Sequence, residues 1–209
     1  MRGFALRGML LLALSMFYFV QGPLFAHNLV DLQKFNPKIC IDLRFATYNN
    51  ILGLPIYPSN RIFVEHYVAT RLGRVQRELA KEGLGLIVIE GYRPPSIQCF
   101  LDHVYCERGL ESSKYEASHY CKGIGVDVMI YYLEGQPIKI PSFYQDSSFR
   151  AYRDYPYLSA NAYHNSYVLE KYMTANGFDP QREKWWHFDL KGWESAPNLE
   201  AEYEELLCR

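Results

Sequence analysis

The sequence has no basic stripe, no internal repeat and no low-complexity segment. Without clustered lysines and arginines, nucleic acid is not expected as a partner. The sequence also lacks a zinc-ribbon pattern, since the spacings of its five cysteines match none. Export would permit one or two disulfides, but an odd number cannot all pair, and a domain of this size does not need such cross-links. The sequence therefore assigns no cysteine pairs.

A long membrane span is missing as well. The apolar run from Met9 to Val20 is short for a span. Arg2 and Arg7 precede this run and Gln21-Gly22-Pro23 ends it, which is the order of a secretory signal peptide over residues 1–26. We expect an exported protein, periplasmic or secreted, with no stable membrane association after cleavage; an uncleaved anchor is the alternative. Cleavage would change the formal charge from −1 to −3, since two arginines are lost.

The remaining chain is long enough for one sizeable core. Of the 209 residues, 49% are hydrophobic, which predicts a single domain over residues 27–209. Apolar spacing and stop signals predict helices over 60–82, 97–108 and 161–176. Short apolar or alternating runs predict strands over 39–45, 84–90, 125–132 and 185–190. This order favours an α+β fold, a mostly antiparallel central sheet with helices packed on it.

Two stretches carry the residue types of a zinc hydrolase. The first runs from Ser118 to Asp127 as Ser-His-Tyr-Cys-Lys-Gly-Ile-Gly-Val-Asp, and the second from Glu183 to His187 as Glu-Lys-Trp-Trp-His. Together they supply two histidines, two carboxylates and a glycine-bounded turn. Histidine and carboxylate ligands beside a free base suit a mononuclear zinc site with one open coordination position.

These stretches, with others in order along the chain, resemble the zinc D-alanyl-D-alanine dipeptidases of the VanX type, within the family of zinc D,D-carboxypeptidases. The resemblance also covers residues 42–53, with Asp-Leu-Arg-Phe-Ala-Thr-Tyr-Asn-Asn-Ile-Leu-Gly, and residues 90–94, with Glu-Gly-Tyr-Arg-Pro. It implies hydrolysis of the small D,D-dipeptide D-Ala-D-Ala by one Zn²⁺ per chain, in peptidoglycan-related metabolism. Residues 42–53 favour the dipeptidase branch over carboxypeptidases that act on longer muropeptides.

The resemblance also implies a role for each site residue. His119, Asp127 and His187 would bind Zn²⁺. Glu183 would be the catalytic base, and Arg93 would stabilise the oxyanion. Substrate binding would fall to Ser118, at the free amino end of the dipeptide, and to Glu90.

Two positions depart from the family pattern by one residue. The family motif Ser-x-His-x-x-Gly-x-Ala-x-Asp puts Tyr120 in the histidine place, with His119 beside it, and puts Gly125 in the alanine place. The motif Glu-x-x-His puts Lys184 in the glutamate place, with Glu183 beside it. Adjacent side chains of an extended segment point to opposite faces, so a shift by one residue matters.

Two interpretations of these shifts stay open. A bulge near the glycines would turn His119 inward, and Glu183 would turn inward while Lys184 turns outward; the chain is then an enzyme. Alternatively, Tyr120 and Lys184 replace a ligand and the base. The chain is then a catalytically degenerate homologue that binds peptidoglycan peptides or a protein partner without turnover.

Overall fold

The computed structural model describes residues 28–109, 119–192 and 196–208. The predicted signal peptide and Ser118 lie outside these residues. Within them, no helix has both the length and the apolar character needed to cross a membrane. The five cysteines all lie in the described part of the chain, and none forms a disulfide there.

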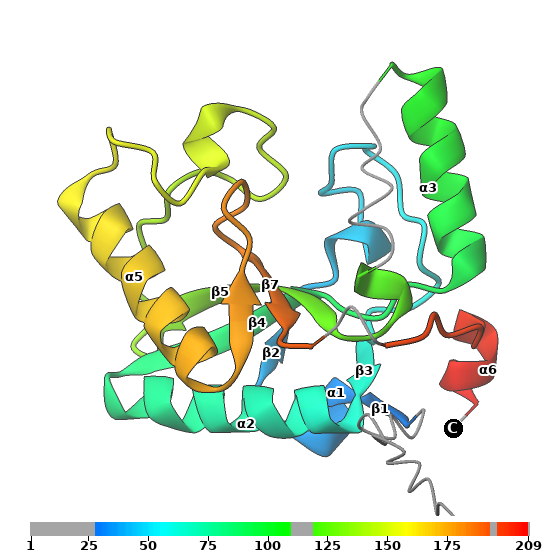
Figure 1. Cartoon of the computed structure of the whole chain (residues 1–209), viewed down its shortest axis with the longest axis horizontal. Coiled ribbons are helices and arrows are strands. Elements are labelled where there is room, and N and C mark those ends of the chain that lie inside the picture. Colours follow the sequence, from blue (N-terminus) through cyan, green and yellow to red (C-terminus); the bar gives the residue numbers. More distant parts are fainter. Residues whose placement is uncertain (1–27, 110–118, 193–195, 209) are drawn as a thin grey trace, which may run out of the picture.

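A five-stranded sheet forms the centre of the fold, in the order β2-β4-β5-β7-β6 (Figure 1). Pairing is antiparallel except between the short β2 and β4, which run parallel. The predicted α+β class is confirmed, and the sheet is mixed at one edge. The strands are β2 (Cys40–Ile41), β4 (Leu84–Glu90), β5 (Gly125–Tyr132), β7 (His187–Leu190) and β6 (Phe178–Pro180).

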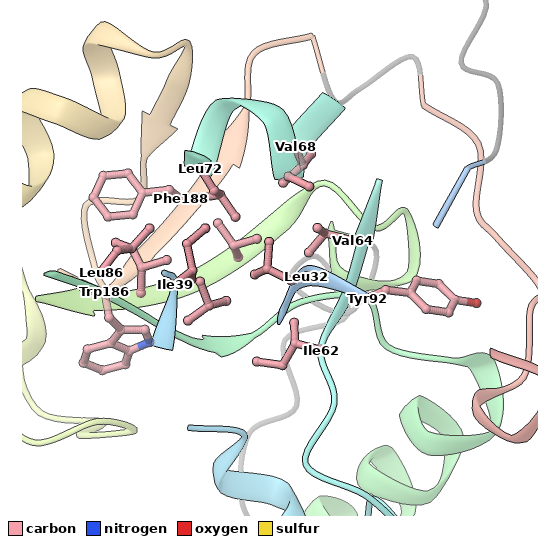
Figure 2. Packing of buried hydrophobic residues seen from close by; sticks show 14 of the residues in the cluster. Leu32, Ile39, Ile62, Val64, Val68, Leu72, Leu86, Tyr92, Trp186 and Phe188 are labelled. Carbon is pink, nitrogen blue, oxygen red and sulfur yellow. The ribbon is translucent and has the colours of Figure 1, made fainter. Parts of the chain in front are cut away.

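Two long helices cover the sheet. Helix α2 (His66–Lys81) packs against β4 and against α5 (Ala160–Ala175), which in turn packs against β5 and β6. The buried face of α2 repeats at helical spacing through Val68, Leu72 and other apolar residues. In Figure 2 Leu72 lies towards Phe188 of the sheet, and Val68 lies over Val64 and Leu32. The core predicted beneath this helix is therefore present.

Shorter elements complete the chain and correct three predicted boundaries. The predicted helix over 60–82 begins only at His66, because residues 63–65 form a strand in a second, two-stranded sheet. The predicted strand over 39–45 pairs only through residues 40–41, since the chain then turns into a 3₁₀ helix. The last core strand begins at His187 rather than at residue 185. The remaining elements are β1 (Leu29–Asp31), α1 (Leu32–Phe35), η1 (Arg44–Ala46), β3 (Phe63–Glu65), α3 (Pro95–Glu107), η2 (Phe149–Ala151) and α6 (Tyr203–Leu207).

Candidate metal centre and its surroundings

Strands β5 and β7 place the polar groups of the candidate site next to each other. In their antiparallel register Asp127 lies opposite His187, and Gly125 lies opposite Asp189. Residues two apart on a strand point to the same face, so these four positions share one face of the sheet. The three polar side chains are at most 2% exposed. A buried acid–base cluster therefore lies on this face.

His187 lies between two carboxylates. Its Nδ1 atom is 2.7 Å from Oδ1 of Asp127, and its Nε2 atom is 3.1 Å from Oδ1 of Asp189. Burial alone lowers the pKa of His187, but the hydrogen bonds to Asp127 and Asp189 outweigh it and raise the pKa to about 9. Without a bound metal, His187 is therefore an imidazolium at neutral pH.

Asp189 also contacts His119. Nδ1 of His119 is 2.7 Å from Oδ1 of Asp189, and the His119 ring stacks on the His187 ring with centroids 5.8 Å apart. Burial raises the pKa of Asp189, but hydrogen bonds from His119 and His187 hold it well below its ordinary value. The other carboxylate oxygen of Asp189 accepts a hydrogen bond of 2.6 Å from Nε2 of Gln181. All of these contacts fix Asp189 as an anion.

The charge on His187 predicts a pH dependence for the metal-free protein. Its pKa rises from about 6.5 in the unfolded chain to about 9 in the folded protein. The resulting stability is fully present below pH 6.5 and is lost as the pH rises through 9. We expect the free energy of unfolding to fall by roughly 3 kcal/mol over this range. Urea titrations with a chelator at pH 6.5 and 9 measure the change. If the free energy of unfolding depends on pH in the same way in His187→Asn, the effect does not come from His187.

Asp127 is surrounded by tyrosine hydroxyls. The hydroxyl of Tyr120 donates to the two carboxylate oxygens at 2.9 and 3.0 Å, and it also lies 3.2 Å from Nδ1 of His187. The hydroxyl of Tyr144 donates to Oδ2 of Asp127 at 2.7 Å. The hydroxyl of Tyr120 thus contacts both partners of the Asp127–His187 pair.

A second buried ion pair lies next to Tyr120. Nη2 of Arg93 is 3.0 Å from Oε2 of Glu90, and its Nη1 donates to Gln98 at 2.9 Å. Oε1 of Glu90 accepts a hydrogen bond of 3.1 Å from Tyr57. The Arg93 guanidinium lies 4.2 Å from the centroid of the Tyr120 ring. Its Nε has no hydrogen-bond partner among the described residues, so one donor remains for a bound molecule.

Glu90 reaches this position through an irregularity in β4. The register between β4 and β5 shifts between Val88 and Glu90, which places Glu90 opposite Asp127. Burial raises the pKa of Glu90, whereas the positive charge of Arg93 lowers it; the net direction is upward. The bulge thus brings the Arg93–Glu90 pair to the same end of the sheet as the histidine cluster.

The described residues could hold a metal at one place. The ligand atoms of His119, His187 and Asp189 all lie within 4.8 Å of one another. Four ligands about 2.0–2.2 Å from a tetrahedral zinc ion are roughly 3.3–3.6 Å apart, so small side-chain shifts would bring the three together. Two imidazoles and one carboxylate are also the donor types that zinc binds in proteins. These residues therefore fit the metal predicted from the resemblance.

The structure brings together most of the predicted site residues, in a different arrangement. Asp127 and His187 meet, and Arg93 and Glu90 lie beside them. His119 is in contact with Asp189, whereas Tyr120 occupies the side facing Asp127. Glu183 is exposed and Lys184 half-buried, just before β7.

Asp189, Tyr144 and Gln181 were missed by sequence reasoning. A signal existed only for Asp189, which follows His187 at strand spacing and so shares its face. Tyr144 and Gln181 lie in irregular segments, for which no periodicity indicates a direction.

Comparisons with known proteins show the family of this chain. A family described as D-Ala-D-Ala dipeptidase, peptidase family M15, matches residues 26–205, and the chain belongs to this family. The D-alanyl-D-alanine dipeptidase of Escherichia coli K12 is 26% identical over 84% of this chain and 91% of its own length. The D-alanyl-D-alanine dipeptidase of Enterococcus faecalis is 29% identical over 71% of this chain and 84% of its own.

Among solved structures, the chain is similar to a vancomycin-resistance D,D-dipeptidase, VanXYg, in complex with a D-Ala-D-Ala phosphinate analogue. The TM-score is 0.35 at 12% identity, covering 78% of this chain and 66% of that one. This likeness is too low to carry an argument about the site.

Proposed function

We propose that this protein hydrolyses D-Ala-D-Ala to two D-alanines with one zinc ion per chain, in peptidoglycan-related metabolism. The observation that carries the proposal is the buried set of two histidines and one carboxylate within 4.8 Å. Membership of a peptidase family, and relatives named D-alanyl-D-alanine dipeptidases, support the choice of substrate. A bound zinc ion would supply a water molecule of lowered pKa.

The remaining groups are proposed to act on the substrate. Arg93 donates to the oxygen that becomes negative when water adds to the peptide carbonyl, and Glu90 and Gln98 hold its guanidinium in place. Ser118 is proposed to hold the free amino end of the dipeptide. Glu183 is proposed as the base, which requires its exposed side chain to turn inward.

Replacing Arg93 by lysine tests the oxyanion role. Lysine keeps a positive charge beside Glu90 but lacks the planar fork of donors. We expect kcat for D-Ala-D-Ala to fall by about 10²–10³, which is typical of losing one oxyanion donor. Arg61→Lys, at the half-buried pair with Asp31, serves as the control and should leave kcat unchanged. If Arg93→Lys loses activity only to the extent that it loses thermal stability, the assigned role is contradicted.

Binding without turnover is the second candidate function. The observation that favours it is Tyr120, whose hydroxyl contacts Asp127 and His187, two residues that the family pattern assigns to zinc. Lys184 in the place of the family glutamate points the same way. Such a protein would still offer Arg93 to the carbonyl or carboxylate of a peptide.

One assay separates the two candidates. The purified protein, produced with its own leader, is incubated with D-Ala-D-Ala and, as a control, with L-Ala-L-Ala. Release of D-alanine is followed before and after treatment with a chelator, and again after addition of Zn²⁺. Release that is lost with the chelator and restored by zinc supports hydrolysis. Saturable calorimetric binding of D-Ala-D-Ala without release would establish the binding protein.

We also propose that the protein is exported, to the periplasm or outside the cell. The basic and then apolar order of residues 1–26 supports this, and the family match begins at residue 26. N-terminal sequencing of the protein from its host should find His27 as the first residue. Recovery of the intact leader in the membrane fraction would instead indicate an anchor.

A further inference from the structure

We infer that this chain binds its metal through His119, His187 and Asp189, and that Asp127 positions His187 instead of binding the metal. The inference rests on the proposed function only in that a metal is bound, and it holds whether or not the substrate is turned over. Relative to the ligand set predicted from the resemblance, the carboxylate changes from β5 to β7. The metal consequently lies at Nε2 of His187 rather than at Nδ1.

The donor atoms on this side of His187 already converge. Oδ1 of Asp189 is 2.7 Å from Nδ1 of His119 and 3.1 Å from Nε2 of His187. None of the three residues is more than 1% exposed. Both imidazoles are therefore directed at one carboxylate oxygen, and an ion placed among them would replace hydrogen bonds that link the same atoms. In the metal-bound protein the histidines give up the protons that form those bonds.

The far side of His187 has the partner that a metal-binding histidine needs. A ligating histidine normally donates its other ring N–H to a carboxylate, which fixes its tautomer and orientation. Asp127 provides this at Nδ1 with a distance of 2.7 Å. Asp127 is in turn held by the hydroxyls of Tyr120 and Tyr144, which donate to its two oxygens. These contacts suit Asp127 to an orienting role.

The ligand Asp189 has its own support. Its second oxygen accepts a hydrogen bond of 2.6 Å from Gln181, which leaves Oδ1 for the two histidines. A ligating carboxylate is commonly hydrogen-bonded in this way. Asp189 lies on β7, paired with Gly125 of β5, so its backbone is fixed by the sheet.

Gly125 makes the space that His119 occupies. A Cβ atom added at Gly125 would lie 2.9 Å from Cβ of His119 and 3.1 Å from Oδ1 of Asp189. The first distance is below what real Cβ contacts show, so His119 could not pack here beside an alanine. The family pattern has alanine at this place. Gly125 in place of the family alanine therefore makes room for His119, which lies one residue before the histidine of the family pattern.

The opposite side of His187 is filled. The hydroxyl of Tyr120 lies within 3.2 Å of Nδ1 of His187 and of the oxygens of Asp127. This hydroxyl donates to the carboxylate of Asp127. A metal on that side would have to displace this hydroxyl from its contacts with Asp127 and His187.

Metal content of single variants tests the inference. Wild type, His119→Gln, Asp189→Asn, Asp127→Asn and Tyr120→Phe are loaded with Zn²⁺, dialysed and measured by mass spectrometry. We expect about one zinc in wild type and Tyr120→Phe, and no stoichiometric zinc in His119→Gln and Asp189→Asn. Asp127→Asn should still bind, with an affinity lowered by about 10- to 100-fold. Circular dichroism confirms that each variant is folded.

The opposite pattern overturns the inference. Zinc retained by Asp189→Asn and lost from Asp127→Asn would place the metal on the Asp127 side, and loss from Tyr120→Phe would make the tyrosine a ligand. Wild type without zinc overturns it as well. Gly125→Ala alters no ligand and should weaken zinc binding by displacing His119; unchanged affinity would count against the inference. Zinc bound as expected without release of D-alanine rejects the proposed hydrolysis alone.

Discussion

Replacing Glu90 by glutamine should lower the free energy of unfolding by about 3–5 kcal/mol. The reason is the buried guanidinium of Arg93, which would lose the carboxylate that lies 3.0 Å from it. Glu90 is 1% exposed and Arg93 7%, so water cannot replace the missing charge. The glutamine keeps the size of the side chain, and the loss therefore reports the charge rather than a cavity. Urea unfolding followed by circular dichroism measures it.

A surface pair of the same chemistry is the control. Arg182 and Asp154 are 2.8 Å apart, and their side chains are 68% and 56% exposed. Asp154→Asn should leave the unfolding midpoint unchanged, because solvent screens such a pair. A change of similar size in both variants would show that burial of the Arg93–Glu90 pair is not the cause. No change in either would mean that Arg93 finds another partner when Glu90 is replaced.

Much of the fold could be predicted because its strongest elements carry local signals. The β-branched run at 84–90 and the run at 125–132 are the strands β4 and β5 at the predicted boundaries. The helix over 161–176 is present one residue earlier, as α5. Pairings between distant segments carry no such signal. The parallel pairing of β2 with β4 and the antiparallel pairing of β1 with β3 depend on tertiary packing rather than on periodicity.

The sequence predicted several residues of the site but not which of their side chains contact each other. Motif spacing located Asp127 and His187, and their register on β5 and β7 explains why they meet. Spacing could not show that His119 and Tyr120 contact opposite sides of His187, because this follows from the short helical turn at 119–121 rather than from an extended segment. The assumption that adjacent side chains point to opposite faces was applied to a segment that is not a strand.

Neither interpretation of the shifted histidine considered Asp189, which lies two residues after His187 on the same strand. In the structure His119 turns inward, yet towards Asp189, while Tyr120 occupies the place beside Asp127. The two adjacent residues thus serve the two ends of one buried row that runs from Asp127 through His187 to Asp189. Because Asp189 lies on the same face of the strand as His187, His119 finds a carboxylate partner although it lies one residue before the histidine of the family pattern.

Replacing Lys184 by glutamate should raise kcat for D-Ala-D-Ala by about 10²–10⁴, the usual contribution of a well-placed general base. The backbone N–H of His187 donates to the carbonyl oxygen of Lys184 at 3.1 Å, so a turn brings residue 184 next to His187. Glu183 is one residue further away and exposed. A carboxylate at 184 would therefore lie closer to His187 than the proposed base does, and it could take a proton from a water molecule that a bound zinc ion would supply. Steady-state release of D-alanine measures the effect.

Two further variants serve as controls for the base role of a carboxylate at position 184. Lys184→Gln removes the charge without adding a base and should leave kcat nearly unchanged. If kcat rises as much in Lys184→Gln as in Lys184→Glu, the increase is due to loss of the lysine rather than to the new carboxylate. Glu183→Gln should lower kcat in the wild-type background, where Glu183 is the proposed base, but have little effect beside Lys184→Glu. If Lys184→Glu gives no increase while zinc remains bound, the turn does not direct residue 184 towards the reacting water, and the metal at Nε2 of His187 lies beyond its reach.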